Sequence, residues 1–162
     1  MWLWKVDIQK ISRKLFLQNF LQMKMIFYAD DDIDDVEIFQ EAVSRVVTDV
    51  EVIPTSNCED LLANIENNKF PLPDYIFLDL NMPKKSGRIC LKDLRQNPLL
   101  KDTRVIILST SRNEHDILST YEDGADYYIS KPNSLGGYKE ALSKLFSAPF
   151  DSRPPIDRYL IN

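Results

Sequence analysis

The chain has 162 residues, 44% of them hydrophobic, and a formal net charge of −5 at pH 7. This length fits one globular domain with short extensions and leaves little room for a separate output domain. No apolar run approaches the roughly 18 residues that a membrane-spanning helix needs, and direct DNA binding normally uses a basic surface. We therefore expect no transmembrane segment and no direct DNA binding.

Residues 1–24 differ in pattern from the rest of the chain. Their apolar residues follow helical spacing with basic residues among them, namely Trp4, Ile8, Ile11 and Leu15 with Lys5, Lys10, Arg13 and Lys14. A basic amphipathic helix of this kind can lie on a membrane surface or on a partner protein. Alternatively, because Met23 and Met25 lie just before and at the start of the first strand-like run, residues 1–24 are an artefact of the choice of start site. Both interpretations stay open.

From residue 25 onward, short apolar runs alternate with longer segments of helical periodicity. The strand-sized runs are 25–29, 50–54, 75–78, 104–108 and 126–129. The segment between the first two has Val36, Phe39, Val43 and Val46 on one helical face. Alternating strands and helices are arranged most simply as a parallel sheet with right-handed crossovers and helices on both faces. We therefore predict a doubly wound α/β domain.

The two cysteines, Cys58 and Cys90, fall in separate helix-like segments. Their spacing is not that of a metal site. We interpret both as reduced thiols of a cytosolic protein that pack in the core.

Polar residues follow four of the predicted strands at the point where each strand ends. Asp30 and Asp31 follow the first strand, Asp79 the third, Ser109 the fourth and Lys131 the fifth. In open parallel sheets, ligands bind beyond the carboxyl ends of the strands. Three carboxylates gathered there repel one another unless a cation compensates, and an all-oxygen ligand set suits Mg²⁺. The sequence therefore predicts a magnesium site in which a phosphate group can complete the coordination shell of the ion.

Residues 25 to about 147 resemble the receiver domains of response regulators in two-component signalling. The resemblance rests on four pieces in order, Ala29-Asp30-Asp31-Asp32, Leu78-Asp79-Leu80-Asn81-Met82-Pro83 with Gly87, Ser109-Thr110, and Lys131-Pro132. Each piece alone is weak, but four in order at four strand ends rarely arise by chance. The fold implied is flavodoxin-like, a (βα)5 domain with strand order 2-1-3-4-5. The chain is most similar to stand-alone receivers with an acidic run like that from Asp30 to Asp35, including those that partner phytochrome-type histidine kinases.

The resemblance assigns roles to the residues at the strand ends. It implies that Asp79 accepts a phosphoryl group from the phosphohistidine of a histidine kinase or phosphotransfer protein. Mg²⁺ would be bound directly by Asp31 and Asp79, largely through water by Asp30, and by the backbone carbonyl of Asn81. Because phosphoryl transfer needs mainly positioning and charge neutralisation, the ion and Lys131 would supply most of the catalysis.

The resemblance also implies a switch. Phosphorylation adds negative charge and acceptor oxygens at the acceptor residue, which would draw the Ser109 hydroxyl inward and let Tyr128 move into the vacated space. This movement would reshape residues 113–147, the expected docking face for a downstream protein. The lifetime of the acyl phosphate is expected to depend on three neighbours, namely Asn81, Thr110 and Ser111.

Other residues near the site are expected to have structural roles. Asp34 with Glu37 has the spacing of a helix capping box, and acidic residues favour a helix start, so for Asp34 and Asp35 we favour that role. Gly87 is expected to permit a tight turn. The resemblance also favours a cis bond between Lys131 and Pro132.

Two alternatives to a phosphorylated receiver remain. A haloacid-dehalogenase-like phosphatase would explain Asp30 and Asp32 as an Asp-x-Asp pair followed by Ser109 and Lys131. That family, however, needs a further acidic pair after the lysine, whereas Asp79 precedes the serine. A receiver that binds proteins without phosphorylation usually lacks an acidic residue or the lysine, and none is lost in this sequence.

Residues 148–162 contain Pro149, Pro154 and Pro155 and are too short for an output domain. We expect this C-terminal tail to be a docking segment or disordered. A receiver without an output domain acts through other proteins in the cytoplasm, as a phosphorelay intermediate, a diffusible regulator or a phosphate sink. Homodimerisation through the switch face is a further hypothesis.

Overall fold

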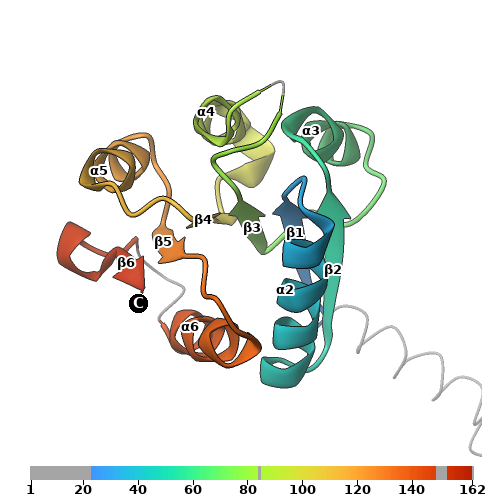
Figure 1. Ribbon diagram of the computed structural model, residues 1–162. Coiled ribbons are helices and arrows are strands. Elements are labelled where there is room, and N and C mark those ends of the chain that lie inside the picture. The colour runs from blue at the N-terminus through green and yellow to red at the C-terminus, as the bar shows by residue number, and fades with distance from the viewer. Residues whose placement is uncertain (1–22, 84, 149–152, 162) are drawn as a thin grey trace, which may run out of the picture.

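The computed structural model describes residues 23–83, 85–148 and 153–161. These residues form a parallel sheet with helices on both faces (Figure 1). The strands are β1 (Lys24–Ala29), β2 (Val50–Thr55), β3 (Tyr75–Leu78), β4 (Arg104–Ser109), β5 (Tyr127–Ser130) and β6 (Leu160–Ile161). The helices are α2 (Ile33–Val46), α3 (Cys58–Glu66), α4 (Gly87–Gln96), α5 (Glu114–Glu122) and α6 (Leu135–Ser147), with the 3₁₀ helices η1 (Pro98–Leu100) and η2 (Ile156–Arg158).

The strand order in the sheet is β2-β1-β3-β4-β5-β6. The first five strands thus have the order 2-1-3-4-5, and the predicted doubly wound, flavodoxin-like fold is confirmed. Each of these five strands lies within one residue of its predicted bounds. The sixth strand, β6, was not predicted.

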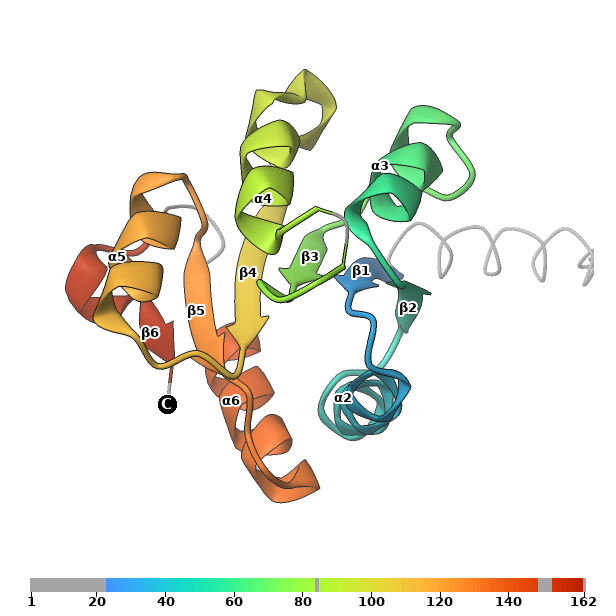
Figure 2. The same cartoon turned by 45° about the horizontal axis from the view of Figure 1, so that its top comes forward.

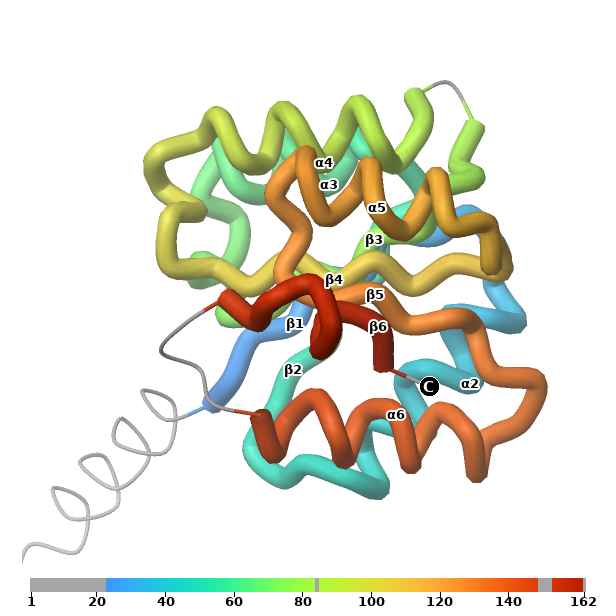
Figure 3. The backbone as a smooth tube through the Cα atoms, turned by 90° about the vertical axis from the view of Figure 1, so that its left-hand side faces the viewer, coloured from blue at the N-terminus to red at the C-terminus, as the bar shows by residue number. Residues whose placement is uncertain are grey.

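The core consists of two apolar layers, one on each face of the sheet. Helices α3, α4 and α5 cover one face, and α2 and α6 cover the other (Figures 1 and 3). Alternate residues of a strand point to opposite faces, so Phe27 and Ala29 of β1 join the first layer while Ile26 and Tyr28 join the second. Because both faces are buried, the central strands β1, β3 and β4 are nearly continuous apolar runs.

The carboxyl ends of β1 and β3 lie level with each other, as do those of β4 and β5. Ala29 is paired with Leu78, and Ser109 with Ser130. The residues that follow these strands are therefore neighbours at one edge of the sheet, where the β1–α2 and β3–α4 loops also lie (Figure 2).

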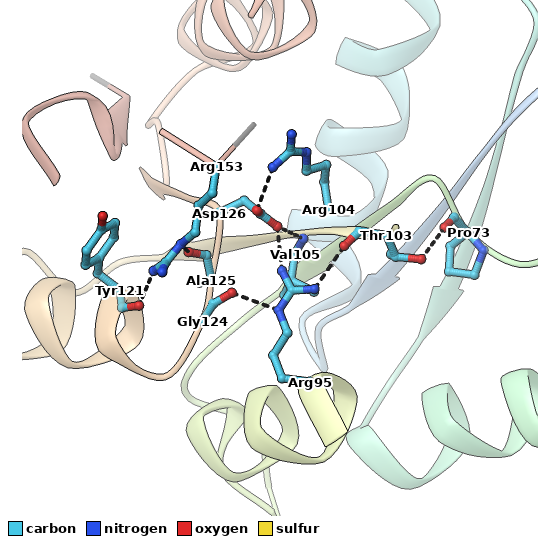
Figure 4. Close-up of polar contacts among 10 residues, drawn as sticks. All are labelled: Pro73, Arg95, Thr103, Arg104, Val105, Tyr121, Gly124, Ala125, Asp126 and Arg153. Carbon is cyan, nitrogen blue, oxygen red and sulfur yellow. Dashed lines mark hydrogen bonds and ion pairs between the residues drawn. The ribbon is translucent and has the colours of Figure 1, made fainter. Parts of the chain in front are cut away.

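A polar network holds the opposite end of the sheet together (Figure 4). Asp126, directly before β5, pairs with Arg104 at 2.8 Å and with Arg95 of α4, and it accepts a hydrogen bond from the backbone N–H of Val105 at 2.8 Å. The Arg95 Nε donates to the Gly124 carbonyl oxygen at 2.8 Å. This network ties α4, β4 and the start of β5 into one unit, away from the predicted site.

Part of the predicted C-terminal tail is folded against β5 (Figure 3). Strand β6 pairs in parallel with β5, with Tyr128 opposite Leu160. Tyr159 is fully buried, and its hydroxyl donates to the Thr120 Oγ1 at 3.0 Å. Residues 153–161 therefore cover the edge of the sheet that β5 would otherwise expose.

The prediction of reduced cysteines is wrong for this structure, because Cys58 and Cys90 form a disulfide. Both side chains are fully buried in the same apolar layer. Their Cα atoms are 5.7 Å apart, within the range that a disulfide spans. Packing of α3 beside α4 brings together two cysteines separated by 32 positions, a proximity that their spacing does not reveal.

Over the part of the chain that is described, no helix combines the length and apolarity needed to cross a membrane. The N-terminal segment, for which an amphipathic helix or a start-site artefact is expected, lies outside the described residues as far as residue 22.

Candidate functional site

Three carboxylates meet at the ends of β1 and β3. Asp30, Asp31 and Asp79 each offer one oxygen, and these oxygens lie within 4.8 Å of one another. Asp30 and Asp79 are buried and Asp31 is exposed. The Oδ1 of Asp79 is buried without a hydrogen-bond partner. A hard divalent cation prefers such an oxygen cluster and would satisfy the unpartnered oxygen, so these residues fit a metal site.

Burial raises the pKa of Asp79 above its ordinary value. The nearby Lys131 lowers this pKa, the Asp30 carboxylate raises it, and backbone hydrogen bonds lower it. One of these bonds runs from the Asn81 N–H to Asp79 Oδ2 at 3.1 Å. The net direction shows that this position disfavours the charged form and would gain from positive charge beside it.

Lys131 brings one positive charge to the cluster. Its Nζ lies 2.7 Å from Asp30 Oδ2, 2.7 Å from Asp35 Oδ2 and 3.7 Å from Asp79 Oδ1. Burial by itself lowers the pKa of Lys131, but hydrogen bonds to Asp30 and Asp35 outweigh it and raise the pKa above its ordinary value. The lysine is therefore a charged ammonium ion at neutral pH.

Asp35 is a site residue that sequence reasoning missed. The predicted capping box at Asp34 is wrong, since the N-cap of α2 is Asp32, whose side chain accepts hydrogen bonds from the backbone of Asp34 and Asp35. With the helix starting at Ile33, Asp35 lies in its first turn and reaches Lys131. The only sequence signal was the acidic run itself, which does not show which members face the site.

Two backbone features shape the rim of the site. The Gly87 N–H donates to the Leu80 carbonyl oxygen at 3.0 Å, and a Cβ on Gly87 would lie 2.0 Å from the carbonyl oxygen of Asp79. Gly87 therefore allows a close backbone approach across the loop after β3, and these contacts do not show the tight turn that was expected there. No peptide bond in the described ranges is cis, so the expectation of a cis Lys131–Pro132 bond is wrong; the trans isomer is the intrinsically favoured one.

The two expected switch residues lie on neighbouring strands. Ser109 ends β4 and is fully buried, and its Oγ accepts a hydrogen bond from the Ser111 N–H at 3.3 Å. Tyr128 of β5 is also fully buried, and its hydroxyl donates to the Ser111 carbonyl oxygen at 2.8 Å. Its ring centroid lies 6.2 Å from that of Tyr159. The tyrosine therefore links the loop after β4 to the C-terminal segment.

The three expected modulating residues differ in exposure. Asn81 and Thr110 are exposed, whereas Ser111 is partly buried and its hydroxyl donates to Asp116 at 2.6 Å. Thr110 also lines an open pocket of about 410 Å³ together with Asp34, Asp35, Ile38, Lys131, Pro132, Asn133 and Tyr138.

Sequence comparison identifies the family of this chain. Residues 26–143 match the model of the response regulator receiver domain. Response regulator Rcp1 of Synechocystis sp. is 35% identical over 116 residues, which are 69% of this chain and 79% of that protein. A chemotaxis protein CheY-3 of Vibrio cholerae is 27% identical over 114 residues, 70% of this chain and 88% of that protein.

Solved structures show the same similarity. The Mn²⁺-bound form of Rcp1 is 30% identical, with a TM-score of 0.70 over 82% of this chain and 99% of that one. The phosphorylated cyanobacterial phytochrome response regulator RcpA is 32% identical, with a TM-score of 0.70 over 76% of this chain and 91% of that one. Fold, strand-end residues and relatives agree, and the chain belongs to the response regulator receiver domain family of two-component signalling.

Proposed function

We propose that this protein is a single-domain response regulator that accepts a phosphoryl group on Asp79 from a histidine kinase or phosphotransfer protein. One observation carries the proposal, namely that the buried Asp79 carboxylate lies beside the oxygens of Asp30 and Asp31 and 3.7 Å from the Lys131 ammonium. The protein turns over no other substrate and catalyses only its own phosphorylation and dephosphorylation.

In the proposed reaction, an oxygen of Asp79 attacks the phosphorus of a phosphohistidine. A new P–O bond forms and the P–N bond breaks, with its electron pair leaving on the imidazole nitrogen. Lys131 neutralises charge that develops on the phosphoryl oxygens, which is the main requirement of this chemistry. No general base is needed because a carboxylate nucleophile, unlike a hydroxyl, has no proton that must be removed as it attacks.

The cation of the site is Mg²⁺ in this proposal, held by Asp30, Asp31, Asp79 and the backbone carbonyl of Asn81. An all-oxygen donor set supports that choice, and the similar Rcp1 structure contains Mn²⁺. When bound, the ion supplies charge neutralisation for the carboxylates and the incoming phosphoryl group.

The output of the proposed switch is the face formed by α5, β5 and α6, residues 113–147. Ser109 would move toward the phosphoryl group and Tyr128 would follow. The hydroxyl of Tyr128 is tied to the loop after β4 through Ser111, which supports such a coupling. A downstream protein, or a second copy of this chain, would bind the altered face.

The phosphoryl donor is proposed to be a phytochrome-type histidine kinase. The similar RcpA is a phytochrome response regulator, and another neighbour at 30% identity acts in red light signalling of R. palustris.

The proposed location is the cytoplasm. The bonded pair of Cys58 and Cys90 argues against it, since cytosolic thiols are normally kept reduced.

The test is the intact mass of wild type and Asp79→Asn after incubation with acetyl phosphate, with Mg²⁺ or with excess chelator. We expect a single added phosphoryl group on wild type with Mg²⁺ and none in the other three samples. A wild type that gains no phosphoryl group would favour a binding module that works without phosphorylation.

A further inference from the structure

Lys131 is shared unequally among three carboxylates. Its Nζ is 2.7 Å from both Asp30 and Asp35 but 3.7 Å from Asp79. The lysine side chain is only 7% exposed, and that of Asp35 is 31% exposed. In this structure, therefore, the ammonium lies closer to Asp30 and Asp35 than to the proposed acceptor carboxylate.

We propose that Asp35 is a positioning residue that holds the Lys131 ammonium in a resting place, from which the lysine is released to the phosphoryl group on Asp79. The inference rests on the proposed function. Asp35 touches neither the acceptor oxygens nor the phosphoryl group and acts only through the lysine.

Of the two close partners of Lys131, Asp35 is the one whose ion pair with the lysine costs less to break. Asp30 is 3% exposed, and its oxygens also accept hydrogen bonds from the Tyr28 hydroxyl and the Asp32 N–H. Losing the ammonium would leave a buried carboxylate short of positive charge, which is costly. Asp35 is half-buried, so water can replace the lysine there at little cost.

The space around Asp35 allows this exchange. Asp35 and Lys131 line the same open pocket of about 410 Å³, together with Thr110 and Tyr138. The Tyr138 hydroxyl is buried without a hydrogen-bond partner among the described residues. An open pocket of this size, with polar side chains such as Asp35, Thr110 and Asn133 in its lining, admits water, which can solvate Asp35 after the ammonium has moved.

This arrangement gives the effect of Asp35 a definite sign. In the reaction with acetyl phosphate, an Asp79 oxygen forms a bond to phosphorus, and the bond from phosphorus to the acetyl oxygen breaks with its electron pair leaving on acetate. Lys131 must approach the phosphoryl oxygens during this step, and the negative charge of Asp35 competes for it. Removing that charge while keeping the side-chain shape should speed phosphorylation.

The experiment compares the second-order rate constant of phosphorylation by acetyl phosphate in saturating Mg²⁺ for wild type, Asp35→Asn and Asp34→Asn. Asp34 lies in the same first turn of α2 and carries the same charge, so its variant controls for helix stability and for general repulsion of the anionic donor. We expect Asp35→Asn to react roughly two- to fivefold faster than Asp34→Asn, the size typical of a half-exposed charge pair. Asp35→Glu, which keeps a carboxylate, should react at a rate closer to that of wild type.

A double-mutant cycle tests whether the effect passes through the lysine. In a Lys131→Ala background, Asp35→Asn should give no acceleration beyond that of Asp34→Asn. Equal rates for the two single variants, or an acceleration that persists without Lys131, would overturn the positioning role alone. If wild type itself gains no phosphoryl group, the proposed function fails and this inference fails with it.

Discussion

The Asp79 carboxylate is buried, and one of its oxygens receives no hydrogen bond. Leaving a buried polar group unsatisfied costs about 1 to 3 kcal/mol. In the absence of metal, we therefore expect Asp79→Asn to increase the free energy of unfolding at pH 7 by about that amount, although it removes the proposed acceptor. Urea unfolding in chelator measures the change, with the exposed Asp102→Asn as a control of unchanged stability.

The gain in stability expected for Asp79→Asn should depend on pH, with a sign set by the raised pKa of Asp79. Because burial raises the pKa of Asp79 above its ordinary 3.8, the folded protein binds more protons than the unfolded chain in the window that begins near that value and extends upward. Wild-type stability falls as pH rises through this window, so the advantage of Asp79→Asn should be small at the acid end and grow toward neutrality. An advantage that is the same at both ends would show that ionisation is not its cause.

Gly87 is the residue where the loop after β3 leaves no room for a side chain. In Gly87→Ala the Cβ would lie 2.0 Å from the Asp79 carbonyl oxygen, so the backbone must shift. We expect a loss of about 1 to 3 kcal/mol, the usual cost of overpacking. The matched control is Gly136→Ala in α6, whose Cβ would meet only Ser134 Oγ at 3.9 Å and which should stabilise the protein by about 0.4 to 1 kcal/mol, because alanine lowers the conformational entropy of the unfolded chain. Urea unfolding should give opposite signs for the two; a Gly87→Ala as stable as wild type would contradict the structure.

At the scale of helices and strands, the features that could be predicted from the sequence are those that depend on local sequence pattern. The first five strands are apolar runs bounded by polar residues, and Asp30, Asp79, Ser109 and Lys131 mark four of their ends, so both the fold and most of the candidate site could be predicted. Strand β6 could not, because two residues are too few to show a period.

The other features that the sequence did not predict depend on tertiary contacts. The pairing of Cys58 with Cys90 depends on how α3 packs beside α4. The contact of Asp35 with Lys131 depends on where α2 begins, and the expected capping box at Asp34 placed that start too late in the chain. Spacing along the chain carries no information on either.

The C-terminal segment should contribute to stability through Tyr159. Its ring is fully buried, and its hydroxyl donates to Thr120 at 3.0 Å. We expect Tyr159→Ala to cost about 3 to 5 kcal/mol, as for other buried aromatic residues, and Tyr159→Phe to cost about 1 kcal/mol for the lost hydrogen bond. Urea unfolding measures both, and amide exchange of Tyr128, whose N–H donates to the Tyr159 carbonyl oxygen, should quicken in Tyr159→Ala. Unchanged stability and exchange would mean that the segment does not dock in solution.

The disulfide makes a second prediction at the scale of elements. It closes a loop between residues 32 positions apart, and a native disulfide typically adds about 2 to 4 kcal/mol. Reduction with dithiothreitol should therefore lower the free energy of unfolding by about that much. The double variant Cys58→Ala, Cys90→Ala should be insensitive to the reductant. If wild type is equally insensitive, and alkylation finds two free thiols, the bond is not formed in solution.

Across the whole molecule, the two ends of the sheet are organised differently. At the amino end, the carboxylate of Asp126 is matched by Arg95 and Arg104. At the carboxyl end, the carboxylates of Asp30, Asp35 and Asp79 lie within 3.7 Å of the Lys131 ammonium, and Asp31 adds a further carboxylate beside Asp30 and Asp79. This excess of negative charge should make the stability of the fold depend on a bound cation.

Cation binding should therefore stabilise the entire fold. A ligand bound only by the folded state adds about 2.7 kcal/mol at a concentration of 100 times its Kd, so Mg²⁺ should raise the melting temperature and excess chelator should reverse the rise. Asp31→Asn should abolish most of this gain and leave metal-free stability nearly unchanged, because Asp31 is exposed whereas Asp30 and Asp79 are buried. Asp102→Asn, far from the cluster in sequence and exposed, should keep the full gain. If Asp31→Asn is stabilised by Mg²⁺ as strongly as Asp102→Asn, the ion binds elsewhere, and the three carboxylates do not form the proposed site.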